Sequence, residues 1–150
     1  MILDDLEKRV FQFFNEVGII QQLSSSMLNR RLPDGLHVSH FGVLNHMVRL
    51  GDGATPLALA SAFQVTKGTM THTLNTLSKR GLVRLAPHET DGRSKVVFLT
   101  DSGRELHSRS IASLAPAIAA LSEKIDLQKV VRLIPDLQEI RETLDKNRDI

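Results

Sequence analysis

Residues 55–85 read TPLALASAFQVTKGTMTHTLNTLSKRGLVRL and residues 91–103 read DGRSKVVFLTDSG, and these two stretches decide the fold. The first stretch predicts two helices joined by a short turn. Thr55 is typical of a helix N-cap and is followed by Pro56, which a first helical turn tolerates, while Thr66 can cap the second helix. This order predicts a helix-turn-helix.

The second of these helices has two chemically different faces. Its apolar residues Met70, Leu74 and Leu77 have the i, i+4, i+7 spacing of a single buried face. Helical geometry then turns the following residues to the other side: Gly68, Thr69, His72, Asn75, Thr76 and Lys79. This outward face is polar but contains no acid, which favours contact with an anionic surface that offers hydrogen-bonding edges.

A β-hairpin is predicted directly after the two helices. Two β-favouring runs, Leu82–Leu85 and Val96–Leu99, flank an Asp-Gly pair at positions 91 and 92. Such a pair predicts a tight turn, because glycine tolerates the positive φ that tight hairpin turns need. Arg93 is then exposed at the hairpin tip. The sequence leaves open whether Phe98, on the other face of its strand, is exposed or covered.

The N-terminal segment predicts a long helix that packs lengthwise on another helix. Its apolar residues alternate between spacings of three and four, at Leu3, Leu6, Val10, Phe13, Val17 and Ile20. We expect Ser24–Ser26 to interrupt this pattern and Ser39 to cap the next helix, which Gly51 ends.

Two more helices are expected after the hairpin. Thr100 or Ser102 caps the first of them, and Pro116 should kink it. Asp126 starts the second, in which Pro135 should cause a bend or a restart. This last helix repeats the alternation of threes and fours, at Leu127, Val130, Ile134, Leu137 and Leu144.

Charge and composition restrict the function further. The chain carries a formal net charge of only +2, but residues 64–95 hold six basic residues against two acidic ones, so positive charge is concentrated there. The absence of cysteine excludes disulfides, thiol redox sensing and thiolate metal sites. An acidic N-terminus and the lack of a long apolar run predict neither a secretory signal nor a membrane span, so we expect a cytoplasmic protein.

The stretch at 55–85 followed by the one at 91–103 resembles the MarR family of bacterial transcription regulators. The features that carry the resemblance are KRGLV at the end of the second helix, D-x-R at the hairpin and L-T-x-x-G at the next helix. The resemblance implies a mainly α fold with a small β-hairpin wing. It implies helical dimerisation segments at 1–32 and 101–150 and a winged helix-turn-helix lobe at 37–100, within a single domain.

For function, the resemblance implies a homodimeric repressor that binds a pseudo-palindromic operator in double-stranded DNA. Its two protomers are expected to be joined through their N- and C-terminal helices. The recognition-helix residues expected at DNA are Thr66, Lys67, Gly68, Thr69, His72, Thr73, Asn75, Thr76 and Lys79. The wing residues are Asp91, Arg93, Ser94 and Lys95, with Arg93 in the minor groove and Asp91 orienting it or stiffening the turn. Many family members carry arginine where this chain has His72.

Three other functions are an enzyme, a protein-binding module and a metal-responsive regulator. The acids are spread along helix starts and solvent faces and no nucleophile is paired with a base, so we expect no enzyme and no catalytic residue. The main alternative is a winged helix that binds a protein and no DNA. Another is a metal-responsive regulator using His37, His40 and His107, although no zinc motif accompanies these residues and we expect neither metal nor cofactor.

An effector pocket is the remaining expectation. The resemblance implies release from DNA by a small aromatic or lipophilic molecule. Phe11, Phe14 and Phe41 are candidates for lining its pocket, with packing in the core as the alternative.

Overall fold

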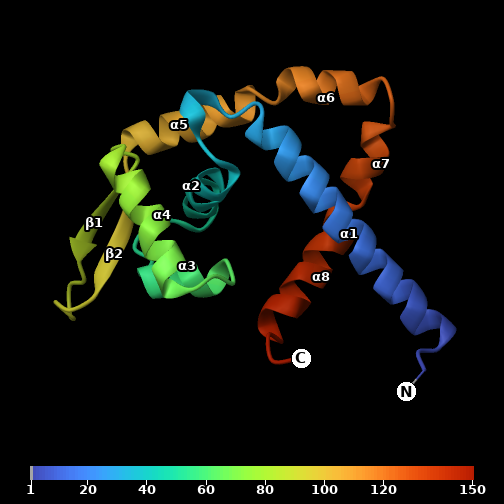
Figure 1. The fold of residues 1–150 in the computed structure, drawn as a ribbon, viewed down its shortest axis with the longest axis horizontal. Helices are drawn as coiled ribbons and strands as arrows, with labels where there is room; N and C mark the ends of the chain where they lie inside the picture. Colours follow the sequence, from blue (N-terminus) through green and yellow to red (C-terminus); the bar gives the residue numbers. More distant parts are fainter. Residues whose placement is uncertain (1) are drawn as a thin grey trace. The chain divides into compact units, whose positions relative to one another are not determined.

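The computed structural model describes residues 2–150 and forms two compact units, one ending at Ser113 and the other comprising Leu114–Ile150. Figure 1 shows a mostly helical chain with one β-hairpin, which confirms the predicted fold class. In the first unit the elements are α1 (Asp5–Asn29), the 3-10 turn η1 (Pro33–Gly35), α2 (Val38–Leu50), α3 (Pro56–Ala62), α4 (Lys67–Lys79), β1 (Val83–Pro87), β2 (Lys95–Leu99) and α5 (Asp101–Ala112). The second unit holds α6 (Ala115–Ser122), α7 (Leu127–Arg132) and α8 (Ile134–Lys146).

The core of the first unit is built from α2 to α5 and the hairpin. Met70, Leu74 and Leu77 are buried, as their spacing predicts. They join Leu44 and Met47 of α2, Leu59 of α3, Val97 of β2 and Leu106 of α5 in one hydrophobic cluster. Burial of these side chains fixes which side of α4 faces outward.

Side-chain caps define where the helices of this lobe begin. Thr55, Thr66 and Thr100 each accept a backbone N–H from the residue three positions on, which confirms three predicted caps. The cap predicted for α2 is wrong. His37 takes that place, because its Nδ1 accepts the backbone N–H of Ser39 and so satisfies a free donor of the first turn.

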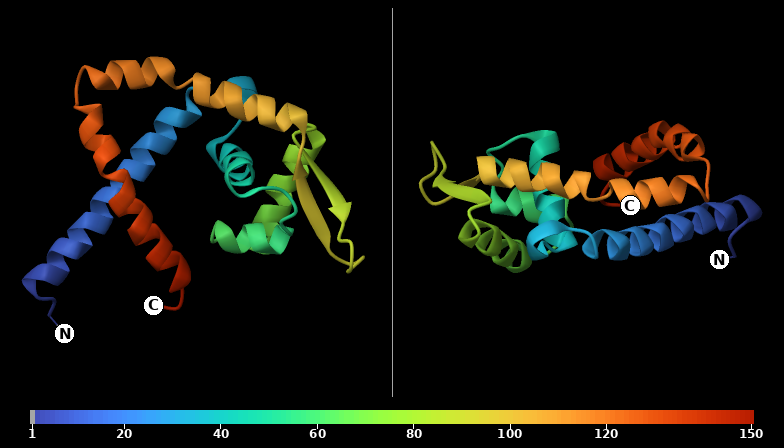
Figure 2. Two further views of the ribbon diagram at one scale, coloured as in Figure 1. Left: turned by 180° about the vertical axis from the view of Figure 1, so that it is seen from behind. Right: turned by 90° about the horizontal axis from the view of Figure 1, so that it is seen from above.

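The hairpin lies beside α4, as Figures 1 and 2 show. Its strands are antiparallel, with Val83 opposite Leu99 and Pro87 opposite Lys95. The first strand begins one residue later and ends two residues later than predicted, and the second begins one residue earlier. An isolated antiparallel bridge also pairs Ala54 with Val97 of β2. The N–H of Gly53 also donates to the Val97 carbonyl, at 2.9 Å, and this tethers the hairpin to the start of α3.

The hairpin predicted around the Asp-Gly pair is present, but the tight turn expected there is wrong. Residues 88–94 form a longer connection, closed at its base by the His88 N–H donating to the Ser94 carbonyl at 2.9 Å. Gly92 does not adopt a positive φ. The turn inside this loop is closed by the Ser94 N–H donating to the Asp91 carbonyl, a geometry that needs no left-handed residue at the second position.

Helix continuity differs from the sequence pattern in two places. α1 runs unbroken through Ser24–Ser26, because serine is tolerated in a helix and Ser24 Oγ bonds the Gln21 carbonyl one turn back. A single helix kinked at Pro116 was expected, but α5 ends and α6 begins anew with this proline in its first turn. Asp126 caps α7, and Pro135 stands in the first turn of α8, which confirms the predicted start and restart.

The long helix α1 buries none of its residues within the chain. The apolar row along most of the helix, which includes Leu6, Val10, Phe13 and Val17, is more than a third exposed, whereas Leu28 near the C-terminal end packs against the core. In the second unit, described by itself, α7 and α8 likewise bury no residue, and Leu137 and Leu144 are exposed. Among residues 2–150, no helix combines the length and the apolar character that a membrane span requires.

Gly103 in α5 packs so tightly against the end of α4 and β2 that a larger residue does not fit. A Cβ at this position would collide with the Leu82 carbonyl oxygen and lie 2.8 Å from Leu99 Cδ1. We expect Gly103→Ala to lower the free energy of unfolding by about 1–3 kcal/mol, measured by denaturant titration. Gly68→Ala, where the nearest atom would be 4.0 Å away, is the matched control and should leave it unchanged or raise it.

Candidate nucleic-acid interface

The outward face of α4 is an exposed polar surface without a carboxylate. Thr66, Lys67, Gly68, Thr69, His72, Asn75 and Lys79 are exposed, and no acid occurs between Lys67 and Lys79. At its N-terminal end, Thr66 Oγ1 accepts the Thr69 N–H at 3.1 Å and its hydroxyl donates to Thr69 Oγ1 at 2.9 Å. Among the hydrogen bonds of residues 2–150, none engages the Lys67 or Gly68 N–H, so these donors face solvent.

Two of the predicted contact residues are placed differently from the rest. Thr73 and Thr76 are half-buried, and their hydroxyls donate to the carbonyls of Thr69 and His72, each at 3.1 Å. A hydroxyl whose proton is already donated within the helix can still accept a hydrogen bond, but it is less free to reorient. Thr69, His72 and Asn75 are exposed along the middle of the same face.

The loop at residues 88–94, here called the wing loop, exposes Arg93. Asp91 holds the loop backbone, because its Oδ1 accepts the Arg93 N–H at 3.0 Å and its Oδ2 accepts the Ser94 hydroxyl at 3.2 Å. Within the described part of the chain, Arg93 forms no ion pair. The Arg93 guanidinium therefore extends from a stiffened backbone with its charge available to an external anion.

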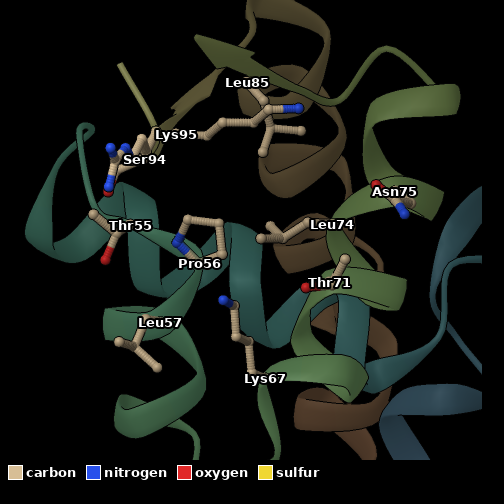
Figure 3. Close-up of a pocket in the computed structure, with 11 residues that line it drawn as sticks. Thr55, Pro56, Leu57, Lys67, Thr71, Leu74, Asn75, Leu85, Ser94 and Lys95 are labelled. Carbon is tan, nitrogen blue, oxygen red and sulfur yellow. The ribbon is translucent and has the colours of Figure 1, made fainter. Parts of the chain in front are cut away.

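A groove of about 540 Å³ connects α4 with the hairpin and the start of α3. Figure 3 shows Lys67, Thr71 and Leu74 from α4 facing Thr55 and Pro56, with the hairpin residues closing one side. The groove lining contains the cationic residues Lys67, Arg93 and Lys95 and no acid. Of the predicted site residues, it brings together Lys67, Asn75, Arg93, Ser94 and Lys95.

The other predicted candidates lie elsewhere. Phe41 is buried and stacks on His107, with ring centroids 5.5 Å apart. Phe11 and Phe14 are exposed on α1, and none of the three phenylalanines lines the groove. His37 and His40 rings are 6.0 Å apart, and His107 Nε2 is hydrogen-bonded to Asn45. Across residues 2–150, no three His, Cys, Asp or Glu side chains form a group that could hold a metal.

Several structural contacts support this surface and were not predicted. Arg84 covers Phe98, its guanidinium carbon 4.5 Å from the ring centroid, which answers the open question about this aromatic residue. Asp52 accepts the Leu99 N–H at 2.9 Å and pairs with Arg104 at 3.2 Å. Cross-strand pairing could have suggested the first contact, whereas no sequence signal joins positions 52 and 104.

The turn before α2 is tied to both α4 and α5. The Asp34 carbonyl accepts a hydrogen bond from Arg80 at 2.8 Å, and the Asp34 carboxylate pairs with Arg109. The hydrogen bond and positive charge of Arg109 hold the pKa of Asp34 below its usual range. Asp34 itself has a φ of 56°, a left-handed conformation in which aspartate is one of the better-tolerated residues.

Comparison with known proteins finds similarity in the same region. A family model described as MarR family matches residues 34–94. An uncharacterised HTH-type transcriptional regulator of Mycobacterium bovis is 32% identical over 87 residues, which are 58% of this chain and 60% of that protein. The chain thus matches somewhat over half the length of this curated relative.

Solved structures share the fold across nearly the whole chain. The transcriptional regulator BldR from Sulfolobus solfataricus superimposes with a TM-score of 0.76 at 22% identity, covering 94% of this chain and 99% of BldR. A mutant MarR from E. coli in complex with operator DNA superimposes with a TM-score of 0.69 at 22% identity, covering 91% and 99%. At these identities the likeness establishes the fold.

Partly buried histidines make stability depend on pH. Burial lowers the pKa values of His40, His46 and His107, and His40 also faces the positive charges of His37, Arg80 and His72. The unfolded chain then binds more protons than the folded one. The free energy of unfolding therefore decreases as the pH falls below 6.5, the ordinary pKa of histidine.

We therefore expect the thermal midpoint to fall from about pH 8 to about pH 5. A variant with these three histidines replaced by glutamine, which stays neutral throughout, should show a flatter profile in the same scan. An equally steep fall in that variant would locate the proton uptake in other groups.

Proposed function

We propose that this chain, whose residues 34–94 match a model of the MarR family, is a sequence-specific DNA-binding transcription regulator of that family. One observation carries the proposal: an exposed, acid-free α4 face continues into a groove lined by Lys67, Arg93 and Lys95. Cations and hydrogen-bond donors on one surface, without intervening carboxylates, match a phosphate backbone with base edges between its strands. A regulator of this kind acts beside bacterial chromosomal DNA, in the cytoplasm.

In this proposal α4 enters the major groove, whose width accommodates a helix. The free N–H groups near Thr66 and Lys67 bind a backbone phosphate at the helix N-terminus. Thr69, His72 and Asn75 supply the exposed side chains that can reach base edges. This set is bordered by Thr73, Thr76 and Lys79. Gly68 has no side chain and so lets the helix backbone come close to the DNA. Base selection then depends on uncharged hydrogen-bonding groups and on the histidine.

The wing loop supplies a second contact. Arg93 enters the neighbouring minor groove, where the narrow walls concentrate negative potential and attract arginine. Ser94 and Lys95 meet the adjoining backbone, and Asp91 stiffens the loop through the hydrogen bonds it accepts from Arg93 N–H and Ser94 Oγ. Arg93 therefore contributes affinity and placement and adds little to sequence choice.

A homodimer is part of the proposal. The exposed apolar row of α1 and the exposed apolar residues of α8 have no partner within their own units, and patches of this kind mark protein interfaces. We assign residues 1–32 and 101–150 to dimerisation and residues 37–100 to DNA binding. Two α4 helices related by a two-fold axis would read half-sites about 10 bp apart in a pseudo-palindromic operator.

Repression relieved by a small aromatic or lipophilic effector completes the proposal. Phe11 and Phe14 remain candidates for its pocket only if a second protomer covers them, because both are exposed on α1. Phe41 contributes from the core side, where it stacks on His107.

The role of Arg93 is testable by salt titration. We expect Arg93→Ala to weaken binding to operator and non-operator DNA alike and to reduce the slope of log K against log salt by about 1, because one phosphate-region cation is lost. Fluorescence anisotropy with labelled duplexes measures both quantities. Arg49→Ala, which removes the same charge from an exposed position of α2 outside the proposed contacts, is the matched control and should leave both unchanged.

Unchanged affinity in Arg93→Ala would refute the wing contact. Failure of the wild-type protein to shift any fragment of neighbouring genomic DNA at low salt would refute DNA binding altogether. That second result would favour the winged helix as a protein-binding module.

The dimer is testable by placing a charge in the apolar row of α1. Val10→Asp should shift the protein toward monomer in sedimentation equilibrium, because a carboxylate in an apolar interface is left unpaired. Gln12→Asp adds the same charge on a different side of the helix and should leave the mass unchanged. A dimer of equal strength in both variants would exclude the α1 row from the interface.

A further inference from the structure

The wing loop contains a histidine whose ring is built into its backbone. His88 is half-buried and directly follows β1, where the hairpin leaves its last pair, Pro87 and Lys95. Its Nδ1 is within 3.2 Å of the Thr90 N–H, 3.3 Å of the Asp91 N–H and 3.1 Å of Thr90 Oγ1. Two backbone N–H donors therefore converge on Nδ1, beside the Thr90 hydroxyl, and this requires an Nδ1 that carries no proton.

The contacts continue from His88 to the arginine. His88 Nδ1 holds the Asp91 backbone, and the Asp91 carboxylate in turn accepts the Arg93 N–H at 3.0 Å. The His88 N–H bond to the Ser94 carbonyl closes the same loop from the opposite side. Thr90, Asp91 and Ser94 are thus bonded to His88 directly, and the Arg93 backbone is joined to it through Asp91.

We propose that His88 is a positioning residue for the wing, whose ring nitrogen fixes the backbone that carries Arg93. The mechanism resembles an Asx turn, in which the side-chain oxygen of Asn or Asp accepts the backbone N–H two residues on. In His88 the δ nitrogen takes the place of that oxygen. An ordered loop lowers the entropic cost of DNA binding, because the backbone that carries Arg93 loses less freedom when the complex forms. This benefit rests on the DNA contact proposed above for Arg93.

The test separates the acceptor atom from the bulk of the ring. His88→Asn keeps an acceptor at the δ position, His88→Leu has a similar size without one, and His88→Gln moves the acceptor one bond outward. Two quantities are measured on the full-length protein. The first is exchange of the Thr90, Asp91 and Arg93 amide protons with water, followed by NMR without DNA. The second is affinity for a genomic operator fragment.

We expect His88→Leu to speed amide exchange and to weaken operator binding by about three- to tenfold, because a loss of this size corresponds to one ordinary hydrogen bond. His88→Asn should restore both quantities to within about twofold, and His88→Gln should restore neither. Exchange rates in His88→Leu equal to wild type, or equal rescue by Asn and Gln, would overturn the proposal. If the wild-type protein bound no DNA, the DNA-binding function would fail, while amide exchange would still decide the role of His88.

Discussion

Burial of one row of α4 side chains is the constraint on which the rest of the lobe depends. Leu74 and Leu77 are almost fully buried, and Met70 extends the row toward the helix start. Removing side chains of this size from water stabilises the fold by about 1.5–3 kcal/mol each. Because a helix cannot rotate without exposing that row, the polar face with His72 and Asn75 points outward for a reason unrelated to its function. The surface proposed to read DNA is thus oriented by the core.

The sequence predicted most of this lobe because its signals are local. Threonine caps at positions 55, 66 and 100 and the spacing of Met70 and Leu74 depend on residues a few positions apart, and the structure confirms them. The failures are also informative. Ser39 is a better cap former than histidine in general, but His37 lies where its Nδ1 reaches the free amide. The Asp-Gly pair correctly predicted a hairpin, but the tight turn expected there is wrong, because the connection is seven residues long and Gly92 has no positive φ.

Contacts between distant positions could not have been predicted from spacing. Asp34 joins Arg80 and Arg109, and Asp52 joins Leu99 to Arg104, across separations that only the folded chain brings together. The predicted interface residues are clustered in space, and the groove adds Thr55, Pro56 and Thr71 to them. Thr71 belongs to neither of the two α4 faces that the periodicity defined, so its place at the side of the groove depends on the position of the hairpin. The apolar row of α1 was predicted as a packing seam and is exposed within the first unit, and the proposed homodimer would cover it.

The attachment of the hairpin to the start of α3 has an evolutionary consequence. Gly53 N–H donates to the Val97 carbonyl and Val97 N–H to the Ala54 carbonyl, both at 2.9 Å, and these bonds involve only main-chain atoms. Main-chain bonds place few demands on side-chain identity, so the wing can change its residues while its position is retained. New binding preferences can then arise by substitution in the wing loop and on α4 without redesign of the scaffold.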